Sequence, residues 1–246
     1  MNIKRTKKMI DFHSHILPSI DDGSKSPEMS VEMIKTGINQ GVNKFIFTPH
    51  FYSDLTSYED FIISRKKALI ELTAYCEENE FTIPDFLVGA EVALTDKTCN
   101  IENLDKLCIE GTELLLLELP YSPFVSWTPK AIYNIMYERN LTPVMAHLDR
   151  YIANRSHKAV IEDILKMDIP IQINASAFLE RKGRKFVKKL IENGNSVVLG
   201  SDVHNLKTRP YEFYKAKESA SKKFKTDVWS LLKNNGEDIL QIYKKD

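Results

Sequence analysis

Short apolar runs alternate along the chain with longer stretches in which apolar residues recur every three or four positions. The short runs are typical of buried strands, and the periodic stretches are typical of amphipathic helices. This pattern predicts strands at residues 9–13, 44–48, 86–91, 114–119, 143–147, 169–174 and 196–201. It predicts helices at residues 27–40, 58–80, 129–139, 157–167, 179–193, 210–223 and 227–243, with a break in the last one near residues 234–236. Residues 94–107 are less regular and are expected to form a loop with a short helix.

Proline and glycine mark the expected ends of several helices. Pro27, Pro129 and Pro210 stand at the start of helical stretches, where the first turn accepts a residue without an amide hydrogen. Gly41 and Gly194 follow helical stretches directly, at the position where many helices end in a left-handed residue.

Alternation of strands and helices predicts an α/β fold in which helices cover a parallel sheet. An open doubly wound sheet and a closed barrel both satisfy this pattern. No Pro/Gly/Ser-rich linker, composition break or internal repeat interrupts the chain. We therefore expect one domain over residues 9–246, preceded by a tail of residues 1–8.

Composition narrows the class of protein. The 246 residues are 43% hydrophobic and 28% charged, as in ordinary globular proteins. Lysines plus arginines equal aspartates plus glutamates at 34 each, so the chain lacks the excess of positive charge that attracts nucleic acid. The N-terminus lacks the apolar segment of a signal peptide, and no apolar run approaches the ~20 residues of a membrane span. A cytoplasmic protein without membrane insertion is expected.

The histidines have an informative distribution. Five of the six stand at or just after the end of a predicted strand: His13, His15, His50, His147 and His204. Three carboxylates share this position: Glu91, Glu118 and Asp202. Because the carboxyl ends of parallel strands face one edge of a sheet or barrel, residues that are distant in sequence meet there. His157 is the exception, and we expect it to be an ordinary exposed residue near the start of a helix.

Spacing adds to this picture. Residues i and i+2 of an extended chain share a face, so His13 and His15 can direct two ligands into one cavity, and so can Asp202 and His204. Asp11 is expected on the same face behind His13, where a carboxylate holds a histidine in the required tautomer. Histidine and carboxylate ligands without cysteine suit Zn, Mn or Fe. Eight or nine such ligands exceed the needs of one ion, so two to three divalent ions are expected.

Five segments, IDFHSHILPSIDDGS, TPH, GAEV, AHLDRY and GSDVHN, follow one another between about residue 9 and residue 209. Together they resemble the PHP (polymerase and histidinol phosphatase) superfamily and, within it, the bacterial capsular-polysaccharide tyrosine phosphatases. The HSH–DDGS opening is specific, whereas TPH alone is not. The resemblance implies a distorted (β/α)7 TIM-like barrel whose metal site lies at the carboxyl ends of the strands. It implies a trinuclear site that commonly holds Mn2+, with Fe, Zn or Mg as alternatives.

The resemblance also implies a ligand set for each ion. One ion would take His13, His15, Glu91 and Asp202. A second would share Glu91 and take Glu118 and His147, and a third would take Asp22, His50 and His204. Arg150 and Arg209 match the family's phosphate-binding arginines. Leu148 and Asp149 stand where Pro–Glu is usual, a departure that affects no implied ligand.

The function that this resemblance implies is hydrolysis of a phosphomonoester by a metal-bound hydroxide. The implied substrate is the phosphotyrosine-bearing tail of an autophosphorylated bacterial tyrosine kinase of capsule or exopolysaccharide synthesis. Histidinol phosphate or another small phosphomonoester remains an alternative, because metal ions and arginines recognise phosphate rather than the alcohol. If the leaving oxygen requires a proton, a metal-bound water or Asp21 is a candidate donor.

Three other classes of protein fit less well. Metal-dependent amidohydrolases also open with His-x-His, but no lysine stands at a strand end to bridge two ions. A metal-stabilised binding module would not need the two arginines. Cysteine phosphatases place an arginine six residues after the nucleophile, whereas Thr82, Asp105 and Leu114 occupy the corresponding positions after the three cysteines.

Two further segments allow two interpretations each. The basic run at residues 181–189 either docks an acidic, multiply phosphorylated tail or forms the solvated face of a helix. The aromatic segment at residues 121–127 either walls the substrate pocket or packs at the rim of the barrel.

Overall fold

The computed structural model describes residues 7–120 and 126–245. Its strands are β1 (Ile10–Ser14), β2 (Lys44–Phe47), β3 (His50–Phe51), β4 (Phe86–Val88), β5 (Glu91–Ala93), β6 (Leu114–Glu118), β7 (Thr142–Met145), β8 (Ile171–Asn174) and β9 (Val197–Gly200). Its α-helices are α1 (Pro27–Asn39), α2 (Tyr58–Glu78), α3 (Thr128–Glu138), α4 (Lys158–Ile164), α5 (Arg181–Glu192), α6 (Phe213–Lys223) and α7 (Val228–Ile242). The predicted tail lies outside the described residues except for Lys7 and Lys8, as does the aromatic segment at 121–127 except for Ser126 and Trp127.

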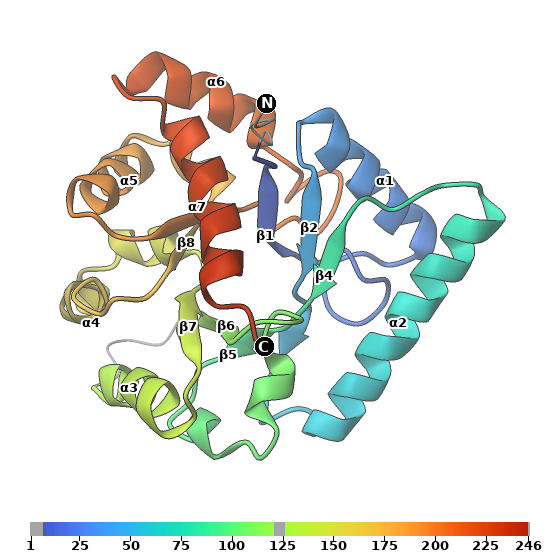
Figure 1. Cartoon of the computed structure of the whole chain (residues 1–246), viewed down its shortest axis with the longest axis horizontal. Coiled ribbons are helices and arrows are strands. Elements are labelled where there is room, and N and C mark those ends of the chain that lie inside the picture. Colours follow the sequence, from blue (N-terminus) through green and yellow to red (C-terminus); the bar gives the residue numbers. More distant parts are fainter. Residues whose placement is uncertain (1–6, 121–125, 246) are drawn as a thin grey trace, which may run out of the picture.

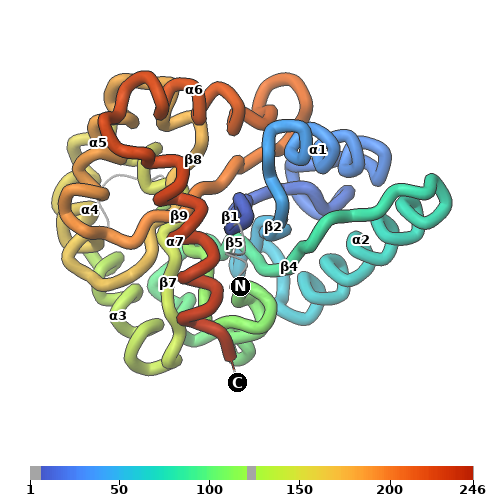
Figure 2. The backbone as a smooth tube through the Cα atoms, turned by 45° about the horizontal axis from the view of Figure 1, so that its top comes forward, coloured from blue at the N-terminus to red at the C-terminus, as the bar shows by residue number. Residues whose placement is uncertain are grey.

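All strand pairs in the described residues are parallel, and they form two sheets with the orders β1-β2-β4 and β3-β5-β6-β7-β8-β9. The chain passes from the first sheet to the second between β2 and β3 and again between β4 and β5. A parallel bridge from Ser14 to Val203 brings the chain after β9 back beside the end of β1. The strands therefore follow one another in chain order around a distorted barrel, with α1 to α6 around it and α7 running beside β1 and packing against β9 (Figures 1 and 2).

Side chains point alternately to the two faces of each strand, and this separates two hydrophobic cores. Leu114 and Leu116 of β6 belong to an inner cluster together with Phe12, Ile46 and Val144 from other strands. The intervening Leu115 and Leu117 belong to the larger cluster between the strands and the helices. Glu118 continues the inner series at the carboxyl end of β6, because every second residue of a strand shares a face. This places its carboxylate over the interior of the barrel.

An irregularity in β1 determines which of its side chains face inward. Asp11 pairs with Phe45 and Ser14 pairs with Phe47, so three residue steps of β1 match two of β2. An extra residue of this kind is a β-bulge, which re-aims the side chains that follow. Ile10 and Phe12 alternate regularly into the inner core, and the bulge lets His13 also reach the inner side, where its ring contacts Gln172 of β8.

Two predictions about the C-terminal helices were wrong. The break near residues 234–236 is absent, because α7 is continuous and a Cβ on its Gly236 would lie 3.1 Å from the ring of Phe12. Glycine thus allows close packing of the helix on β1. Pro210 does not begin a helix, since α6 starts at Phe213. Tertiary hydrogen bonds hold the preceding segment: Tyr211 donates its hydroxyl to Asp11 and accepts at its carbonyl from Gln40.

Other predictions about where helices begin and end were confirmed. Pro27 occupies the first turn of α1, and Gly41 and Gly194 have left-handed φ values of 93° and 76°.

The predicted strand at 86–91 is divided into β4 and β5. Residues 94–107 contain two short 3-10 helices, η1 (Thr98–Asn100) and η2 (Leu104–Leu107).

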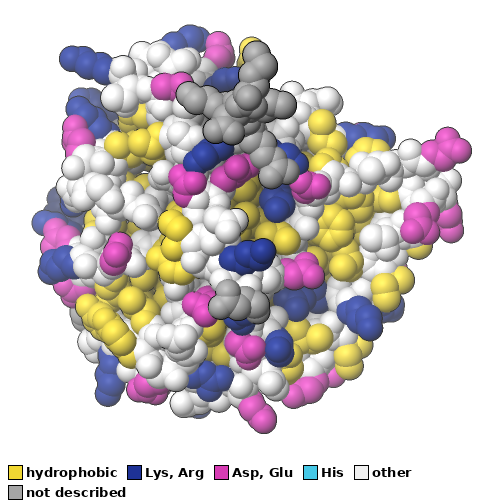
Figure 3. Space-filling model, in the orientation of Figure 1, with side chains coloured by type: hydrophobic (Ala, Val, Ile, Leu, Met, Phe, Trp, Pro, Cys, Tyr) yellow, Lys and Arg dark blue, Asp and Glu magenta, His cyan; other side chains and the backbone are white. Residues whose placement is uncertain are grey.

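The outer surface is mixed in charge. Figure 3 shows the face crossed by α7, where lysine and arginine side chains alternate with aspartate and glutamate. The basic run at 181–189 lies on α5, whose Phe186, Val187 and Leu190 are buried while most of its lysines and arginines are exposed. None of the helices in the described part of the chain is long and apolar enough to cross a membrane.

Candidate metal centre

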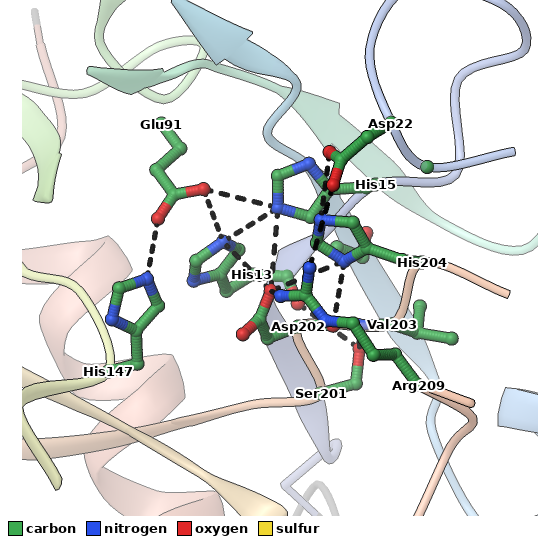
Figure 4. A network of polar contacts seen from close by, with 12 residues as sticks. His13, His15, Asp22, Glu91, His147, Ser201, Asp202, Val203, His204 and Arg209 are labelled. Carbon is green, nitrogen blue, oxygen red and sulfur yellow. Dashed lines mark hydrogen bonds and ion pairs between the residues drawn. The ribbon is translucent and has the colours of Figure 1, made fainter. Parts of the chain in front are cut away.

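The carboxyl ends of the strands carry a cluster of histidine and carboxylate side chains (Figure 4). Most come from the end of a strand or from the loop that follows it, as expected for a site in a parallel α/β fold, whereas His50 and Glu91 begin the short strands β3 and β5. Four overlapping groups have ligand atoms within 4.8 Å of one another: His13, His15 and Asp202; His13, Glu91 and His147; His50, Glu91 and Glu118; and His15, Asp22, His50 and His204. The structure thus brings together every residue that was expected to be a metal ligand.

Hydrogen bonds define the tautomers of His13 and His15. Nδ1 of His13 lies 2.9 Å from Oε1 of Gln172, an oxygen that also accepts the backbone N–H of His147. Nδ1 of His15 lies 2.7 Å from a carboxylate oxygen of Asp21. Because both partners are acceptors, each Nδ1 carries a proton, and Nε2 of each neutral ring presents a lone pair.

These lone pairs converge on one another and on two carboxylates. The Nε2 atoms of His13 and His15 are 3.0 Å apart and lie 3.0 and 3.2 Å from Oε2 of Glu91. Oδ1 of Asp202 lies 3.8 and 3.6 Å from the same nitrogens. Four electron-rich atoms at these separations repel one another unless positive charge lies between them. Their nitrogen and oxygen chemistry fits a divalent ion such as Mn2+, Fe2+ or Zn2+.

The pKa shifts indicate that the protein favours positive charge at this point. Burial by itself lowers the pKa of His15, but hydrogen bonds to Asp21 and Glu91 raise it to about 10. Burial raises the pKa of Glu118 to about 7, and the negative charge of Glu91 contributes to the rise. A cation relieves repulsion between such neighbouring carboxylates, and it can replace the proton that the imidazoles would otherwise take up.

Glu91 occupies the centre of the cluster. Its carboxylate is fully buried, and Oε1 lies 2.7 Å from Nε2 of His147. Oε2 lies 2.9 Å from Nδ1 of His50, in addition to its contacts with His13 and His15. Glu91 takes this position because it begins β5, just after the chain leaves the first sheet. Its two oxygens therefore serve two different groups of histidines.

The third group is the most open to solvent. Oδ1 of Asp22 lies 3.2 Å from Nε2 of His204 and 3.5 Å from Nε2 of His50. The His204 side chain is 1% exposed, whereas that of Asp22 is 65% exposed. Nε2 of His204 is buried and has no hydrogen-bond partner among the described residues. Since buried polar atoms are nearly always paired, this nitrogen beside a carboxylate fits a metal ligand.

Residues 9–241 match a family model described as capsular polysaccharide synthesis, CpsB/CapC. The chain belongs to this CpsB/CapC family. A tyrosine-protein phosphatase CpsB from Streptococcus agalactiae is 30% identical over 247 residues, which cover 92% of this chain and 99% of the relative. The family match confirms the resemblance to the capsular-polysaccharide phosphatases that the sequence motifs indicated.

Solved structures confirm the fold of this CpsB/CapC chain. A structure from work on YwqE from Bacillus subtilis and CpsB from Streptococcus pneumoniae, described as unique metal-dependent tyrosine phosphatases, matches with a TM-score of 0.79 at 24% identity and covers 97% of this chain and 96% of that chain. Histidinol phosphate phosphatase from Lactococcus lactis, complexed with zinc, L-histidinol and phosphate, matches with a TM-score of 0.55 at 17% identity and covers 94% of both chains. The predicted TIM-like α/β fold is therefore confirmed.

In this CpsB/CapC chain, the two arginines expected to bind phosphate both contact Asp202. Nη2 of Arg150 donates to Oδ2 of Asp202, and Nη2 of Arg209 donates to Oδ1 at 2.7 Å. The arginine side chains are 29% and 34% exposed, while Asp202 is 1% exposed. The guanidinium groups thus lie between the buried cluster and solvent, where they can meet an entering anion.

Asp11 does not hold a histidine ring, contrary to expectation. One of its oxygens accepts the backbone N–H groups of His13 and Ser201, and the other accepts the hydroxyls of Ser201 and Tyr211. The bulge in β1 explains the difference, because Asp11 and His13 no longer share a face as they would in a regular strand. Asp11 instead joins β1 to the loop after β9, which carries Asp202.

Asp21 takes the role that was expected of Asp11, and its expected role as a proton donor is wrong. Its carboxylate accepts Nδ1–H of His15 and the backbone N–H groups of Gly23 and His50. Burial raises the pKa of Asp21, but these hydrogen bonds outweigh it and hold the pKa well below its usual range. An ionised carboxylate at this position orients His15 and has no proton to give.

The turn that carries Asp21 and Asp22 requires glycine at position 23. A Cβ on Gly23 would lie 2.2 Å from the carbonyl oxygen of His15 and 2.5 Å from its Cβ. The backbone N–H of Ser24 donates to that same carbonyl at 3.0 Å, which closes the turn. The glycine of the DDGS motif is therefore needed for the close approach that brings Asp22 over the cluster.

Two of the ligand-bearing residues have strained backbone. His147 has a φ of 29° and Asp202 a φ of 53°, in the left-handed region that non-glycine residues rarely adopt. Such strain costs on the order of 1–3 kcal/mol and persists only where neighbouring groups hold it. The backbone N–H of Asp202 donates to the carbonyl of His13 at 2.8 Å, and that of His147 donates to Gln172.

The sequence predictions missed Gln172 and Asn174 and misplaced His157. Asn174 ends β8 and Gln172 stands two residues before it on the same face, so the strand-end and i, i+2 arguments applied to His and carboxylate would have found them had amides been included. His157 was expected to be exposed, but it is 5% exposed, and its ring packs edge-on against Tyr151 with centroids 5.4 Å apart. A short 3-10 helix (Arg155–His157) before α4 turns it into the core.

Proposed function

We propose that this CpsB/CapC chain is a metal-dependent phosphatase that hydrolyses phosphotyrosine on a protein. The observation that carries the proposal is the buried convergence of the Nε2 lone pairs of His13 and His15 with the carboxylates of Glu91 and Asp202. This donor set suits hard and borderline divalent ions. Two arginines that contact Asp202, one of these carboxylates, suit an anionic substrate.

We assign the ligands to three ions, most consistent with Mn2+. One would be held by His13, His15, Glu91 and Asp202. A second would be held by Glu91, Glu118 and His147, and a third by Asp22, His50 and His204. Divalent ions in such a cluster supply a water nucleophile at neutral pH and neutralise charge on the phosphoryl group.

The protein's own groups would bind and orient the phosphate. The guanidinium groups of Arg150 and Arg209 lie on either oxygen of Asp202, so both can approach a phosphate seated on the cluster. Arginine offers paired donors in a planar arrangement that matches phosphate oxygens, which lysine does not.

Two features support a tyrosine side chain as the leaving group. Beside Asp22 and His50 there is a cavity of about 400 Å3 whose other walls include Ile20, Tyr52, Leu55 and Phe61, an apolar surface suited to an aromatic ring. In addition, the ionised Asp21 cannot protonate a leaving group. A phenolate, with a pKa of about 10, departs without a proton more readily than an alkoxide.

The relative from Streptococcus agalactiae is named a tyrosine-protein phosphatase. With the capsular polysaccharide synthesis family, this name supports a tyrosine-phosphorylated protein of capsule or exopolysaccharide synthesis as the substrate. We propose that this protein is the autophosphorylated tyrosine kinase that the sequence motifs imply.

A comparison of substrates tests the proposal. Turnover of a phosphotyrosine peptide, a phosphoserine peptide and histidinol phosphate is measured with Mn2+ and again after chelation. We expect the phosphotyrosine peptide to be preferred and chelation to abolish its turnover. Activity that survives chelation would refute metal dependence, and a preference for histidinol phosphate would refute the substrate.

A further inference from the structure

Two buried amides at the end of β8 connect residues of the metal centre that lie far apart in the sequence. Gln172 and Asn174 are 0% and 3% exposed. They stand at positions i and i+2 of β8, so both project to the inner side of the barrel. Neither belongs to the groups of histidine and carboxylate ligands described above.

The hydrogen bonds of these amides all run in one direction. His13 donates Nδ1–H to Oε1 of Gln172 at 2.9 Å. Gln172 donates Nε2–H to Oδ1 of Asn174 at 2.9 Å. Asn174 donates Nδ2–H to Oδ2 of Asp202 at 2.9 Å. The series therefore begins at one proposed ligand and ends at another ligand of the same proposed ion.

The direction is determined at both ends. A carboxylate only accepts, so Asp202 requires the NH2 group of Asn174 to face it, which turns the carbonyl of Asn174 toward Gln172. The backbone N–H of His147 donates to Oε1 of Gln172 at 2.7 Å, which independently assigns that atom as oxygen. His13 must then carry its proton on Nδ1 and direct its Nε2 lone pair toward Glu91 and His15.

The surrounding backbone leaves space for this arrangement. A Cβ on Gly200 of β9 would lie 2.5 Å from Nε2 of Gln172 and 2.7 Å from Cβ of His13. Glycine at position 200 thus allows the amide and the imidazole to lie side by side. The hydrogen bond from His147 to Gln172 also restrains the left-handed backbone of His147.

We propose that Gln172 and Asn174 are positioning residues that act as a directional amide relay, holding His13 in its Nδ1–H tautomer and orienting Asp202 toward the same divalent ion. This inference rests on the metal-dependent function proposed above. The relay specifies which nitrogen of His13 is available to a cation and fixes one oxygen of Asp202. Partners of this kind that orient metal ligands typically change metal affinity about 10- to 100-fold when they are removed.

The first measurement concerns the wild-type protein. Protein labelled with 15N in histidine is studied by long-range proton–nitrogen correlation NMR, with and without diamagnetic Zn2+. We expect the His13 ring to carry its proton on Nδ1 in both states, with Nε2 unprotonated once Zn2+ is bound. A proton on Nε2 with Zn2+ bound would overturn the proposal without any variant.

Variants separate positioning from general stability. Gln172→Leu removes the acceptor, so we expect loss of the protected Nδ1–H signal and about 10- to 100-fold weaker Zn2+ and Mn2+ binding by calorimetry. Gln172→Glu keeps an acceptor for His13 but cannot donate to Asn174, so we expect the Nδ1–H signal to remain. Gln241→Leu, on the exposed face of α7, is the matched control and should change neither signal nor affinity.

The outcomes are distinct. Unchanged metal affinity in Gln172→Leu, or equal loss of the His13 signal in the Leu and Glu variants, would refute the relay. If Gln172→Leu does not fold, the wild-type spectrum and Gln172→Glu decide the question. A wild type that binds Zn2+ with the expected tautomer but hydrolyses no phosphotyrosine would refute the proposed function and support the relay.

Discussion

Replacing Asp21 by Asn preserves the shape of the side chain but removes one acceptor and the negative charge. All three partners of Asp21 are donors: Nδ1–H of His15 at 2.7 Å, the backbone N–H of Gly23 at 2.8 Å and that of His50 at 3.0 Å. His15 and His50 share Oδ2, and Gly23 faces Oδ1. An asparagine must therefore turn its NH2 group toward at least one N–H.

The structure sets the size of the effect. The less costly orientation places NH2 against Gly23 and keeps an oxygen for the two histidines, so it loses one hydrogen bond and the charge assistance of the others. A buried hydrogen bond to a charged group contributes about 1.5–3 kcal/mol, and the Asp21 side chain is only 5% exposed. We expect the free energy of unfolding of the metal-free protein to fall by about 2 kcal/mol. Affinity for Mn2+ should fall at least about tenfold, because His15 is less firmly oriented.

Urea unfolding in the presence of a chelator measures the first quantity, and calorimetric titration with Mn2+ measures the second. Asp168→Asn is the matched control, since Asp168 is exposed just before β8, at the end of the strand remote from the cluster. Surface substitutions of this kind usually change stability by less than about 0.5 kcal/mol. If Asp21→Asn behaves like the control in both assays, the role assigned to Asp21 is wrong.

Three further substitutions or treatments have defined outcomes. Gly23→Ala places a Cβ 2.2 Å from the carbonyl oxygen of His15, so urea unfolding should show that the free energy of unfolding falls by about 1–3 kcal/mol. An unchanged midpoint of urea unfolding would contradict the close approach. Arg209→Lys keeps the charge but loses paired donors, so KM for a phosphotyrosine peptide should rise several-fold at saturating Mn2+. An unchanged KM would exclude phosphate binding by Arg209. Burial raises the pKa of the Cys108 thiol to about 12. Iodoacetamide at pH 8 should therefore neither label Cys108 in the folded protein nor reduce activity. Rapid labelling of Cys108 would show that its thiol is accessible and ionised.

The placement of the proposed ligands could be predicted because each depends on local sequence. Apolar runs define where strands end, and parallel pairing brings those ends to one edge whatever the exact register. His147 and Glu118 follow this rule directly, since each stands at or just beyond the end of an apolar run. The two-residue spacing within His13-x-His15 and Asp202-x-His204 needed no tertiary information beyond an extended backbone.

Packing decided other features. The glycine in α7 was expected to break the helix, but Gly236 meets the ring of Phe12 in β1, so the tertiary contact compensates for its low helix propensity. Similarly, the hydroxyl of Tyr211 donates to Asp11 of β1, so the segment that contains Tyr211 is not helical and α6 begins only at Phe213. His157 is likewise buried because of a packing contact, that of its ring with Tyr151.

The sequence by itself determined the chemistry of the site and the edge at which it assembles. Only the tertiary structure decided which groups hold the ligands: a one-residue bulge sends Asp11 toward Tyr211, and Asp21 supports His15 in its place. Gln172 supports His13 from 159 residues away. Strand ends follow from local patterns of apolar residues, whereas hydrogen-bond partners depend on register and on distances of about 3 Å between remote segments.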